Sequence, residues 1–244
     1  MLTFETAVQQ TGSETSVQLT PLSYYNGTLS SRVYHSMKDA ILSLAYQPGQ
    51  IMRKGDICEQ LDISRSPVSE AVTRLAAEGL VDVIPQAGTF VTRFSMAEIR
   101  EGSFLREALE IAAVELVAKT ITDDQVKLLK RNLRVQQALV DDLDVQGFYQ
   151  FDSEMHNLIF GFTNYRRLAA MAETSWLQVN RARQLVLPNP DRVADTLAEH
   201  RAIVSALQAR DPKAARKATK KHLGQLLLHL EAIELDRPDL FDKK

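Results

Sequence analysis

The sequence predicts a mainly α-helical protein in two parts: three short helices and a β-hairpin, then an all-α antiparallel bundle of six to seven helices. Two observations predict this division. Apolar residues recur every three to four positions through most of the chain, the period of an amphipathic helix. Directly after Gly79, however, "LVDVIPQ" and "TFVTR" are rich in β-branched residues and flank Ala87-Gly88, the pattern of a small hairpin. The helical period resumes near Ser95.

The three N-terminal helices are predicted from their apolar faces and their stop signals. In the first, the expected inward residues are Val33, Met37, Ile41 and Leu44, and Gln47-Pro48-Gly49 ends the helix. In the other two, the expected inward residues are Ile57, Cys58, Leu61, Val68, Val72 and Leu75. Three short helices followed by a hairpin form the layout of a winged helix-turn-helix. We assign this domain to residues 30–94, after a mobile N-terminal tail over residues 1–29 that is rich in Ser, Thr and Gln.

The second part, residues 95–244, is predicted to be helical throughout. Its expected helices are 96–119, 122–142, 145–162, 165–187, 191–209 and 212–235. Several begin with a capping residue followed by acids, as in Thr122-Asp123-Asp124. Because the loops between these long helices are short, neighbouring helices are expected to run antiparallel in a bundle.

Composition limits the classes of protein to consider. The chain has 244 residues, of which 45% are hydrophobic and 25% charged, as in ordinary globular domains. Its only cysteine, Cys58, excludes an internal disulfide framework and is typical of a reducing compartment. We find no apolar run of the roughly 20 residues that a membrane span needs, and expect no secretory signal. These features predict a cytoplasmic protein without membrane contact. The net charge of −2 means that a local patch must hold any polyanionic partner.

The start of the third helix, "SRSPVSEAV", is typical of an element that reads DNA. In a helix-turn-helix the second helix of the pair lies in the major groove, with its N-terminal residues near the base edges. Here that end carries Ser64, Arg65 and Ser66. A helix N-terminus favours phosphate, hydroxyls bind phosphate oxygens, and an arginine can make two hydrogen bonds to guanine. A Ser-Pro motif can also be a simple helix cap, but the preceding helix and the following hairpin favour DNA binding.

These segments resemble the GntR family of bacterial transcription regulators. The resemblance runs in order through "YQPGQIM", "ICEQLDISRSPVSEAVTRLAAEGLV" and "PQAGTFV". It implies that the hairpin, with Gly88 and Thr89 near its tip, contacts the minor groove or the flanking phosphates. The family usually has arginine where this chain has Ser69, and often where it has Gly55, and both positions contact DNA in better-known members.

These departures predict a DNA contact with few charges. Residues 30–95 contain seven Lys/Arg and seven Asp/Glu, so the module is not basic overall. We therefore expect a shallow dependence of DNA affinity on salt or an altered operator. Lys54, Arg53 and Arg74 are the residues that can replace part of the lost charge. The predicted DNA-contacting residues are Lys54, Ser64, Arg65, Ser66, Ser69, Arg74, Gly88 and Thr89.

One aspartate and three histidines of the helical part form a candidate metal site. Asp152 and His156 are four residues apart and therefore share one face of one helix. His200 and His222 lie on two later helices. Three antiparallel helices can bring these side chains to one point, and such a set of oxygen and nitrogen ligands suits Zn, Ni, Mn or Fe. An isolated Asp-x-x-x-His is weak, because such pairs are common on solvated helix faces.

The same four positions resemble the metal-binding FCD ligand domain of the FadR-type GntR subfamily. Its pattern is Asp-x-x-x-His, then "EH..I", then a histidine about twenty-two residues later. The segment "LREALE" is similar to the "R..LE" element of that domain, and this similarity makes Arg106 a candidate for holding an anionic effector. The resemblance extends from residue 30 to about 230. We expect other polar residues of the bundle to line the same cavity, namely Asn164, Trp176, Asn180 and Arg183.

The sequence thus predicts a homodimeric transcription regulator, a repressor rather than an enzyme, that binds a pseudo-palindromic DNA operator. A small carboxylate, bound at a divalent metal in the helical domain, would control DNA binding. Three alternatives stay open: a purely structural metal with the effector elsewhere, an empty site in a protein that binds an acyl compound, and a metalloenzyme. Against the metalloenzyme, the chain has no Glu-x-x-His, no Gly-rich phosphate loop and no Gly-x-Ser-x-Gly. Glu199 would be the candidate base of a hydrolytic site, but it adjoins His200 and is expected to face another side of its helix.

Overall fold

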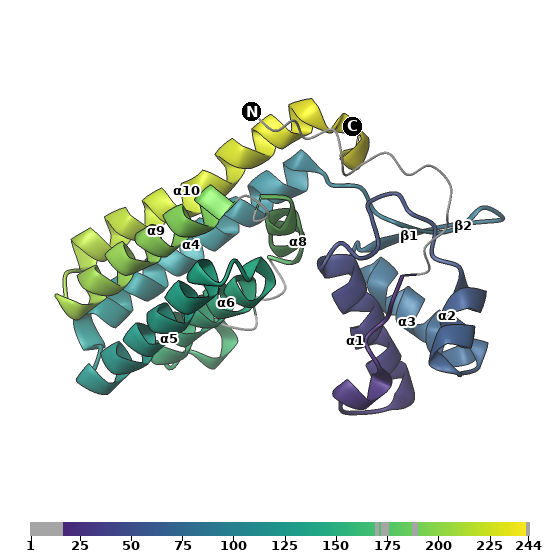
Figure 1. Ribbon diagram of the computed structural model, residues 1–244, viewed down its shortest axis with the longest axis horizontal. Helices are drawn as coiled ribbons and strands as arrows, with labels where there is room; N and C mark the ends of the chain where they lie inside the picture. The colour runs from purple at the N-terminus through teal and green to yellow at the C-terminus, as the bar shows by residue number, and fades with distance from the viewer. Residues whose placement is uncertain (1–16, 169–170, 172–175, 187–189, 243–244) are drawn as a thin grey trace. The chain divides into compact units, whose positions relative to one another are not determined.

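The predicted fold class is confirmed by a computed structural model of the chain, which describes residues 17–168, 171, 176–186 and 190–242 (Figure 1). The chain divides into two compact units, Met1–Thr92 and Arg93–Lys244. The predicted tail lies largely outside the described residues, which begin at residue 17. Residues 17–28 pack on the first helix: Leu19 is buried, and the Ser36 hydroxyl donates a hydrogen bond to the carbonyl oxygen of Thr20 at 2.7 Å.

The first unit is a winged helix-turn-helix. Its elements are η2 (Leu22–Tyr24), α1 (Leu29–Leu42), α2 (Lys54–Leu61), α3 (Arg65–Ala77), β1 (Val81–Ile84) and β2 (Gly88–Val91). Helices α1 and α2 both pack against α3. Between α2 and α3, Asp62 adopts a left-handed conformation, and the amide of Ile63 donates to the carbonyl of Cys58 at 3.0 Å. This closure of α2 produces the sharp turn that starts α3.

Two details of the first unit differ from the sequence prediction. Helix α1 ends at Leu42 rather than at Gln47, because Leu44 adopts a left-handed conformation with φ of 60° and the amide of Tyr46 turns back to Ala40. Leu44 is therefore outside the helix and only half-buried. In α2 only Ile57 is fully buried, whereas Cys58 and Leu61 are half-buried, because α2 packs mainly against one helix, α3.

The hairpin is antiparallel, with Val81 opposite Val91 and Ile84 opposite Gly88. Its turn is closed by the amide of Ala87, which donates to the carbonyl of Ile84 at 3.1 Å. Gly88 has φ of +133°, and a Cβ at this position would lie 3.2 Å from Cδ1 of Ile51. A residue with a side chain would be strained here, so the glycine is required by the turn itself.

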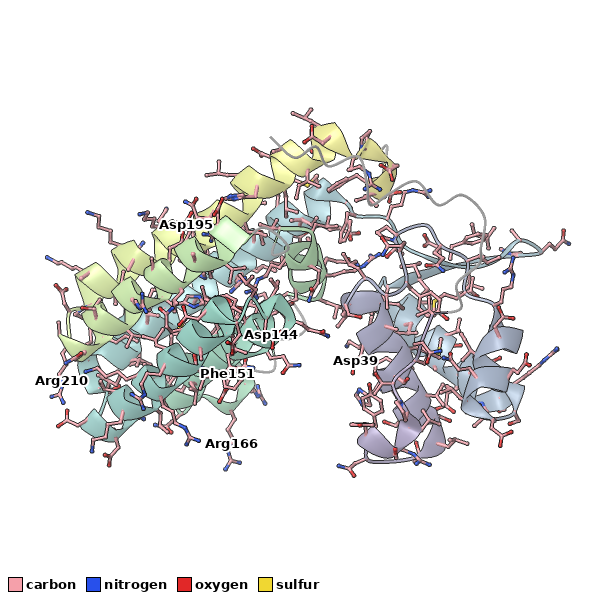
Figure 2. All side chains as sticks on the ribbon, in the orientation of Figure 1. Asp39, Asp144, Phe151, Arg166, Asp195 and Arg210 are labelled. Carbon is pink, nitrogen blue, oxygen red and sulfur yellow. The ribbon has the colours of Figure 1, made fainter. Side chains whose placement is uncertain are left out.

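The second unit is a bundle of helices. Its elements are α4 (Met96–Thr120), α5 (Asp123–Asp141), α6 (Val145–Phe162), α8 (Leu177–Val186), α9 (Pro190–Gln208), α10 (Pro212–Asp236) and η3 (Pro238–Leu240). Most boundaries agree with the prediction within two residues because capping residues define them. Thr122 and Gln125 form a capping box, and Asp211 accepts hydrogen bonds from the amides of Lys213 and Ala214. Arg210 projects from the end of α9 (Figure 2), 3.2 Å from Asp123.

The predicted helix over 165–187 is not continuous. Asn164 has φ of 59° after the end of α6, Trp176 lies in a turn, and α8 begins only at Leu177. Part of this prediction, and the predicted break at residues 188 and 189, lie outside the described residues. Trp176 is 5% exposed and packs on Phe160, with the ring centroids 5.2 Å apart. A tertiary contact of this kind carries no period along the sequence, so periodicity could not reveal the interruption.

Helix α10 packs along α4 and α9, and α5 packs against α6 and α9 (Figure 1). The three helices that carry the candidate metal ligands, α6, α9 and α10, therefore meet inside one bundle. The surrounding core is apolar and includes Val117, Leu129, Met155 and Ile203. Within the described ranges, no helix has the length and apolar character needed to cross a membrane.

The C-terminal segment of the described chain is hydrogen-bonded to the first residues of this unit. The amide of Phe94 donates to the carbonyl of Leu240 at 2.9 Å, and the amide of Asp242 donates to the carbonyl of Phe94 at 2.8 Å. The rings of Phe94 and Phe241 are 5.6 Å apart, and both residues are buried. From α8, the guanidinium of Arg181 lies 4.6 Å from the ring centroid of Phe94. The segment around Phe94 is thus held by both the C-terminal residues and α8.

Candidate functional site

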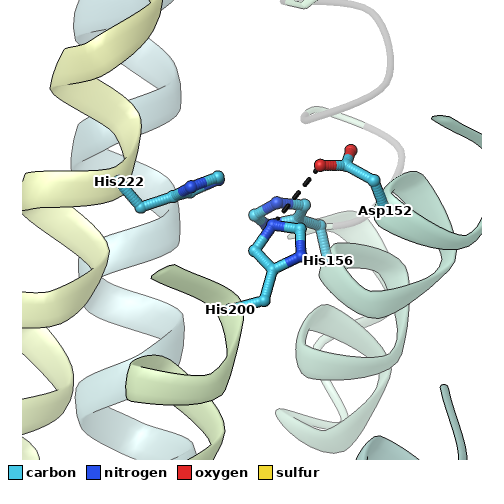
Figure 3. Close-up of side chains that lie close together, drawn as sticks. All are labelled: Asp152, His156, His200 and His222. Carbon is cyan, nitrogen blue, oxygen red and sulfur yellow. Dashed lines mark ion pairs between the residues drawn. The ribbon is translucent and has the colours of Figure 1, made fainter. Parts of the chain in front are cut away.

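Four buried side chains from three helices converge inside the bundle (Figure 3). Helix α6 contributes Asp152 and His156, which are one turn apart, while α9 contributes His200 and α10 contributes His222. One ligand atom from each lies within 4.8 Å of the others. Ligand atoms about 2.1 Å from one ion lie at most about 4.2 Å apart, so an ion would need to draw the set together by about half an ångström. The structure thus brings together all four residues that the sequence singled out.

The three imidazoles are closely packed, and burial favours the neutral form of two of them. The ring centroids of His200 and His222 are 4.7 Å apart, and those of His156 and His222 are 5.3 Å apart. Burial lowers the pKa of His200, and burial together with the charge of His200 lowers the pKa of His222 well below its ordinary value. A neutral imidazole has a free lone pair, which is the form that binds a metal.

Asp152 is a fully buried carboxylate with a cationic partner. Its Oδ2 accepts a hydrogen bond from the guanidinium of Arg183 on α8, and its Oδ1 lies 3.3 Å from Nε2 of His200. Burial alone would raise the pKa of Asp152, but the charge of Arg183 and the neighbouring His200 and His156 together outweigh burial and hold this pKa well below its ordinary value of 3.8. Asp152 is therefore ionised at neutral pH and is available as an oxygen ligand.

Each histidine has its Nδ1 close to an oxygen outside the cluster, but only His200 and His222 make a hydrogen bond there. The Nδ1 atoms of His156, His200 and His222 lie 2.7, 2.8 and 2.8 Å from oxygens of Glu110, Gln136 and Glu199, respectively. With Nδ1 so placed, Nε2 is the ring atom left for a ligand. This arrangement, in which an outer oxygen holds a metal-binding imidazole, is general in metalloproteins.

Several atoms inside the cluster lack a hydrogen-bond partner among the described residues. They include Oδ1 of Asp152, Nε2 of His156 and Nε2 of His200. A buried polar atom without a partner costs free energy, about 1–3 kcal/mol for a neutral group. Three such atoms facing one point are what a divalent cation would satisfy. The donor set, one carboxylate and three imidazoles, suits Zn²⁺ and similar transition metals.

Three arginines border a small cavity beside His222. The cavity, about 30 Å³ in volume, is lined by Arg106, Arg183, Val186, Arg192, Thr196, His222, Leu223 and Leu226. Arg106 is 5% exposed, and its Nε lies 2.6 Å from Oε1 of Glu110. This space holds about two water molecules, so a larger ligand requires the arginine side chains to move.

Not all predicted effector-binding residues line this cavity. Arg106 and Arg183 do, but Asn164 is exposed beyond the end of α6, where its left-handed conformation ends the helix, so it is no part of the cavity. Trp176 packs against the cluster from outside, with its ring centroid 5.1 Å from the guanidinium of Arg106. Asn180 contributes its main-chain carbonyl, which accepts a hydrogen bond from the Tyr149 hydroxyl at 2.8 Å.

Sequence reasoning missed the outer residues, and it misplaced Glu199. Although Glu199 adjoins His200, it reaches the cluster: its Oε2 lies 2.8 Å from Nδ1 of His222, and both its oxygens accept hydrogen bonds from Arg192. Neighbouring helix positions differ by about 100°, and the length of a glutamate side chain spans that difference. Glu110 could have been found from the sequence, since it follows Arg106 at helical spacing. No pattern in the sequence marks Gln136 or Arg192.

In the first unit, the N-terminal end of α3 presents polar groups to solvent. Ser64, Arg65 and Ser66 are exposed, and Ser69 is half-buried one turn later. Ser64 is the N-cap residue of α3, yet among the described residues its hydroxyl makes no capping hydrogen bond. The hydroxyl and the Arg65 guanidinium are therefore both available to an external anion.

Two predicted DNA-contacting residues are placed differently from the prediction. The side chain of Thr89 is only 4% exposed, because β2 is covered on that face, so the exposed tip consists of Pro85, Gln86 and Ala87. The guanidinium of Arg74 lies 3.7 Å from the ring centroid of Tyr34, on the side of α3 that faces α1. Lys54 is half-buried at the start of α2, and Gly88 serves the turn.

Comparisons with known proteins agree with both units. Residues 29–91 match the family described as bacterial regulatory proteins, gntR family, and residues 102–225 match the FCD domain. The chain is 29% identical over 216 residues to the HTH-type transcriptional repressor RspR of Escherichia coli K12, covering 88% of this chain and 95% of RspR. It is 30% identical over 217 residues to an HTH-type transcriptional regulator from an unstable DNA locus of Streptomyces ambofaciens, covering 88% of this chain and 91% of that protein.

Solved structures share the fold. McbR/YncC of Escherichia coli superimposes with a TM-score of 0.71 at 22% identity, over 87% of this chain and 99% of that one. A chain from Rhodococcus sp. RHA1, described as a GntR transcriptional regulator, superimposes with a TM-score of 0.72 at 24% identity, over 83% of this chain and 97% of that one. With a matching N-terminal module, a matching C-terminal domain and relatives along most of its length, this chain belongs to the GntR family of transcription regulators and carries an FCD domain.

Proposed function

We propose that this protein is a homodimeric repressor whose DNA binding is controlled by a small carboxylate bound at a divalent metal in the FCD domain. The observation that carries the proposal is the convergence of Asp152, His156, His200 and His222, with unsatisfied buried ligand atoms facing one point. The winged helix-turn-helix in the same chain is the part that would bind DNA. The name of the relative RspR, a repressor, supports the direction of regulation.

The exposed end of α3 is the part of the first unit that would read DNA. Arg65 can donate two hydrogen bonds to guanine in the major groove, while Ser64 and Ser66 bind phosphate oxygens. A homodimer presents two such helices, so its operator is a pseudo-palindrome. Because Ser69 and Gly55 carry no charge, few phosphates are neutralised, and the affinity decreases only gently with salt.

Arg65→Ala tests the reading helix on DNA selected by the protein from a random library. We expect a loss of about 1–3 kcal/mol in binding free energy, measured by fluorescence anisotropy, if Arg65 contacts guanine. Arg166→Ala is the control, because Arg166 is an exposed arginine of the other unit (Figure 2) and its removal changes the net charge equally. Equal affinity of the Arg65 variant and the wild type would exclude Arg65 from the interface.

Within the FCD domain, Asp152, His156, His200 and His222 would hold the metal. Four protein ligands leave coordination positions open on an octahedral ion, and the ion supplies Lewis acidity there that attracts a carboxylate. Zn, Ni, Mn and Fe all accept this donor set. Gln136 and Glu199 orient His200 and His222, Glu110 lies 2.7 Å from Nδ1 of His156, and Arg183 balances the charge of Asp152.

Metal content tests the site directly. His200→Ala combined with His222→Ala removes two of four ligands, and we expect the protein to retain no stoichiometric metal after incubation with Zn²⁺ and desalting, by elemental analysis. His229→Ala is the control, since His229 is a half-buried histidine of α10 whose Nδ1 contacts the carbonyl of Gln225 instead. The site is refuted if the double variant keeps the metal content of the wild type.

The effector would bind beside the metal, where Arg106 and Arg183 face the cavity. An arginine can hold a carboxylate through two parallel hydrogen bonds. The effector acts on DNA binding through its different affinities for two arrangements of the dimer, since a ligand that binds both equally shifts nothing. The metabolite that causes the protein to leave its operator is then the acid that fits this cavity.

A thermal-shift screen of small carboxylic acids on the Zn²⁺-loaded protein tests this part. Acids that stabilise the wild type should stabilise Arg106→Gln much less, and they should no longer release DNA from this variant. Unchanged stabilisation of Arg106→Gln by those acids would exclude Arg106 from effector binding. If Zn²⁺ stabilises the protein but no acid adds to this effect, the metal is structural and the effector binds elsewhere.

A further inference from the structure

One of the three imidazoles faces a different kind of group from the other two. His156 and His222 face the carboxylates of Glu110 and Glu199, which can only accept a hydrogen bond. His200 instead faces the side-chain amide of Gln136 at 2.8 Å. An amide can donate or accept, so it can orient His200 only if its own orientation is determined by something else.

The orientation of Gln136 is determined by its neighbours on α5 and α6. Its Nε2 donates to Oδ1 of Asn132 at 2.6 Å and to the main-chain carbonyl of Phe151 at 3.3 Å. Nδ2 of Asn132 donates to the same carbonyl at 3.0 Å. A main-chain carbonyl can only accept, so both amide nitrogens must point toward Phe151. Gln136 therefore turns Oε1, an acceptor, toward His200.

This order of donors and acceptors determines which ring nitrogen of His200 carries the hydrogen. Because Oε1 of Gln136 accepts, Nδ1 of His200 must carry the hydrogen, and Nε2 must carry the lone pair that faces Asp152 and the other imidazoles. Gln136 is 0% exposed and Asn132 is 4% exposed, so both amides are largely shielded from bulk water. Reversing the Gln136 amide would place its Oε1 against two other acceptors, Oδ1 of Asn132 and the main-chain carbonyl of Phe151.

We propose that Gln136 and Asn132 are positioning residues that hold His200 in its Nδ1–H tautomer and thereby present Nε2 to the metal. The proposal rests on the metal site of the proposed function, which it extends by two residues that contact no metal. Gln136 acts directly on His200, and Asn132 acts through Gln136. Outer partners of this kind typically contribute 10- to 100-fold to metal affinity.

The first test is the Zn²⁺ affinity of Gln136 variants, measured by competition with a chelator. We expect Gln136→Leu to weaken binding about 10- to 100-fold, because His200 loses its acceptor. Gln136→Glu, which keeps an acceptor at this place, should bind within a few-fold of the wild type or more tightly. Asn132→Leu should fall between the wild type and Gln136→Leu. Gln137→Leu is the matched control, since Gln137 is on the same helix but bonds to Asp141 and Arg201 at the surface.

The second test needs no metal. Nitrogen-15 NMR of the imidazoles in the metal-free wild type should show His200 protonated on Nδ1, and Gln136→Leu should show a mixture of the two neutral tautomers. A His200 protonated on Nε2 in the wild type would overturn the proposal even if a Gln136 variant failed to fold.

The metal site and the positioning role of Gln136 can be tested separately. If His200→Ala abolishes Zn²⁺ binding while Gln136→Leu binds as the wild type does, the metal site stands and the positioning role is wrong. If the wild-type protein binds none of Zn²⁺, Ni²⁺, Mn²⁺ and Fe²⁺, the metal site of the proposed function is wrong, and the tautomer of His200 still decides whether Gln136 orients it.

Discussion

Asp152 is the residue at which the buried charges of the FCD domain meet. One oxygen accepts from Arg183, and the other lies 3.3 Å from His200. An isolated buried charge is unfavourable by several kcal/mol, and the pairing with Arg183 offsets this penalty. The carboxylate thus stays ionised inside the bundle.

Removing Arg183, the partner of Asp152, should show how much the stability of the protein depends on this ion pair. In the metal-free protein, Arg183→Met leaves the carboxylate buried without its cation, and we expect a loss of about 3–5 kcal/mol in unfolding free energy. Urea denaturation followed by the fluorescence of Trp176, the only tryptophan, measures it. Arg183→Met with Asp152→Asn removes both charges and should recover part of the loss. A single variant as stable as the wild type would show that the pair contributes nothing.

At the scale of elements, α8 links the candidate site to the start of the unit. Arg183 reaches Asp152, and Arg181, two positions earlier and so on the opposite side of the helix, lies over the ring of Phe94. Phe94 is also paired with the C-terminal segment through Leu240, Phe241 and Asp242. One short helix therefore contacts both the buried cluster and the segment that leads out of the FCD domain.

The C-terminal segment should stabilise this unit measurably. Phe241 is 3% exposed and contacts Phe94, so Phe241→Ala removes a buried ring at the domain edge. Truncating a buried phenylalanine costs about 3–5 kcal/mol, and a segment near the chain end can relax, so we expect a value near the lower limit. Tyr165→Ala, at an exposed aromatic residue, is the control for the same fluorescence measurement. Equal unfolding midpoints for both variants would show that the segment is only loosely attached.

At the scale of the whole molecule, the buried histidines should make stability depend on pH. The folded-state pKa values of His200 and His222 lie below their ordinary value of 6.5 because both rings are buried. Below pH 6.5 the unfolded chain therefore binds more protons than the folded chain, and stability decreases as the pH falls. The lowered pKa of Asp152, which burial alone would raise but Arg183 depresses, adds a loss in the same direction below its ordinary value of 3.8.

We expect the metal-free protein to lose stability by up to about 1.4 kcal/mol per pH unit for each histidine between pH 6.5 and 5.5. Urea denaturation at a series of pH values measures this slope. The variant His200→Gln with His222→Gln should show a flatter dependence in the same window. An equally steep slope in that variant would assign the pH dependence to other groups.

Much of the fold was predictable from local features. Helix boundaries coincided with caps such as Thr122 and Asp211, and the hairpin followed from β-branched residues around Gly88. Prediction failed where a tertiary contact competes with periodicity. Trp176 lies in a turn within the expected helix over 165–187 and its ring packs on Phe160, and Thr89 is buried although it is next to a turn.

For the candidate site, the sequence by itself determined the residue types: one aspartate, three histidines and an arginine at helical spacings, and a helix that starts with Ser-Arg-Ser. Only the tertiary structure decided which side chains surround them. Gln136, Glu199 and Arg192 come from different turns and helices, and their roles depend on distances of about 3 Å across the bundle. Spacing along a helix determines which residues share a face, but the packing of one helix against another determines which faces meet, and that information is not local in the chain.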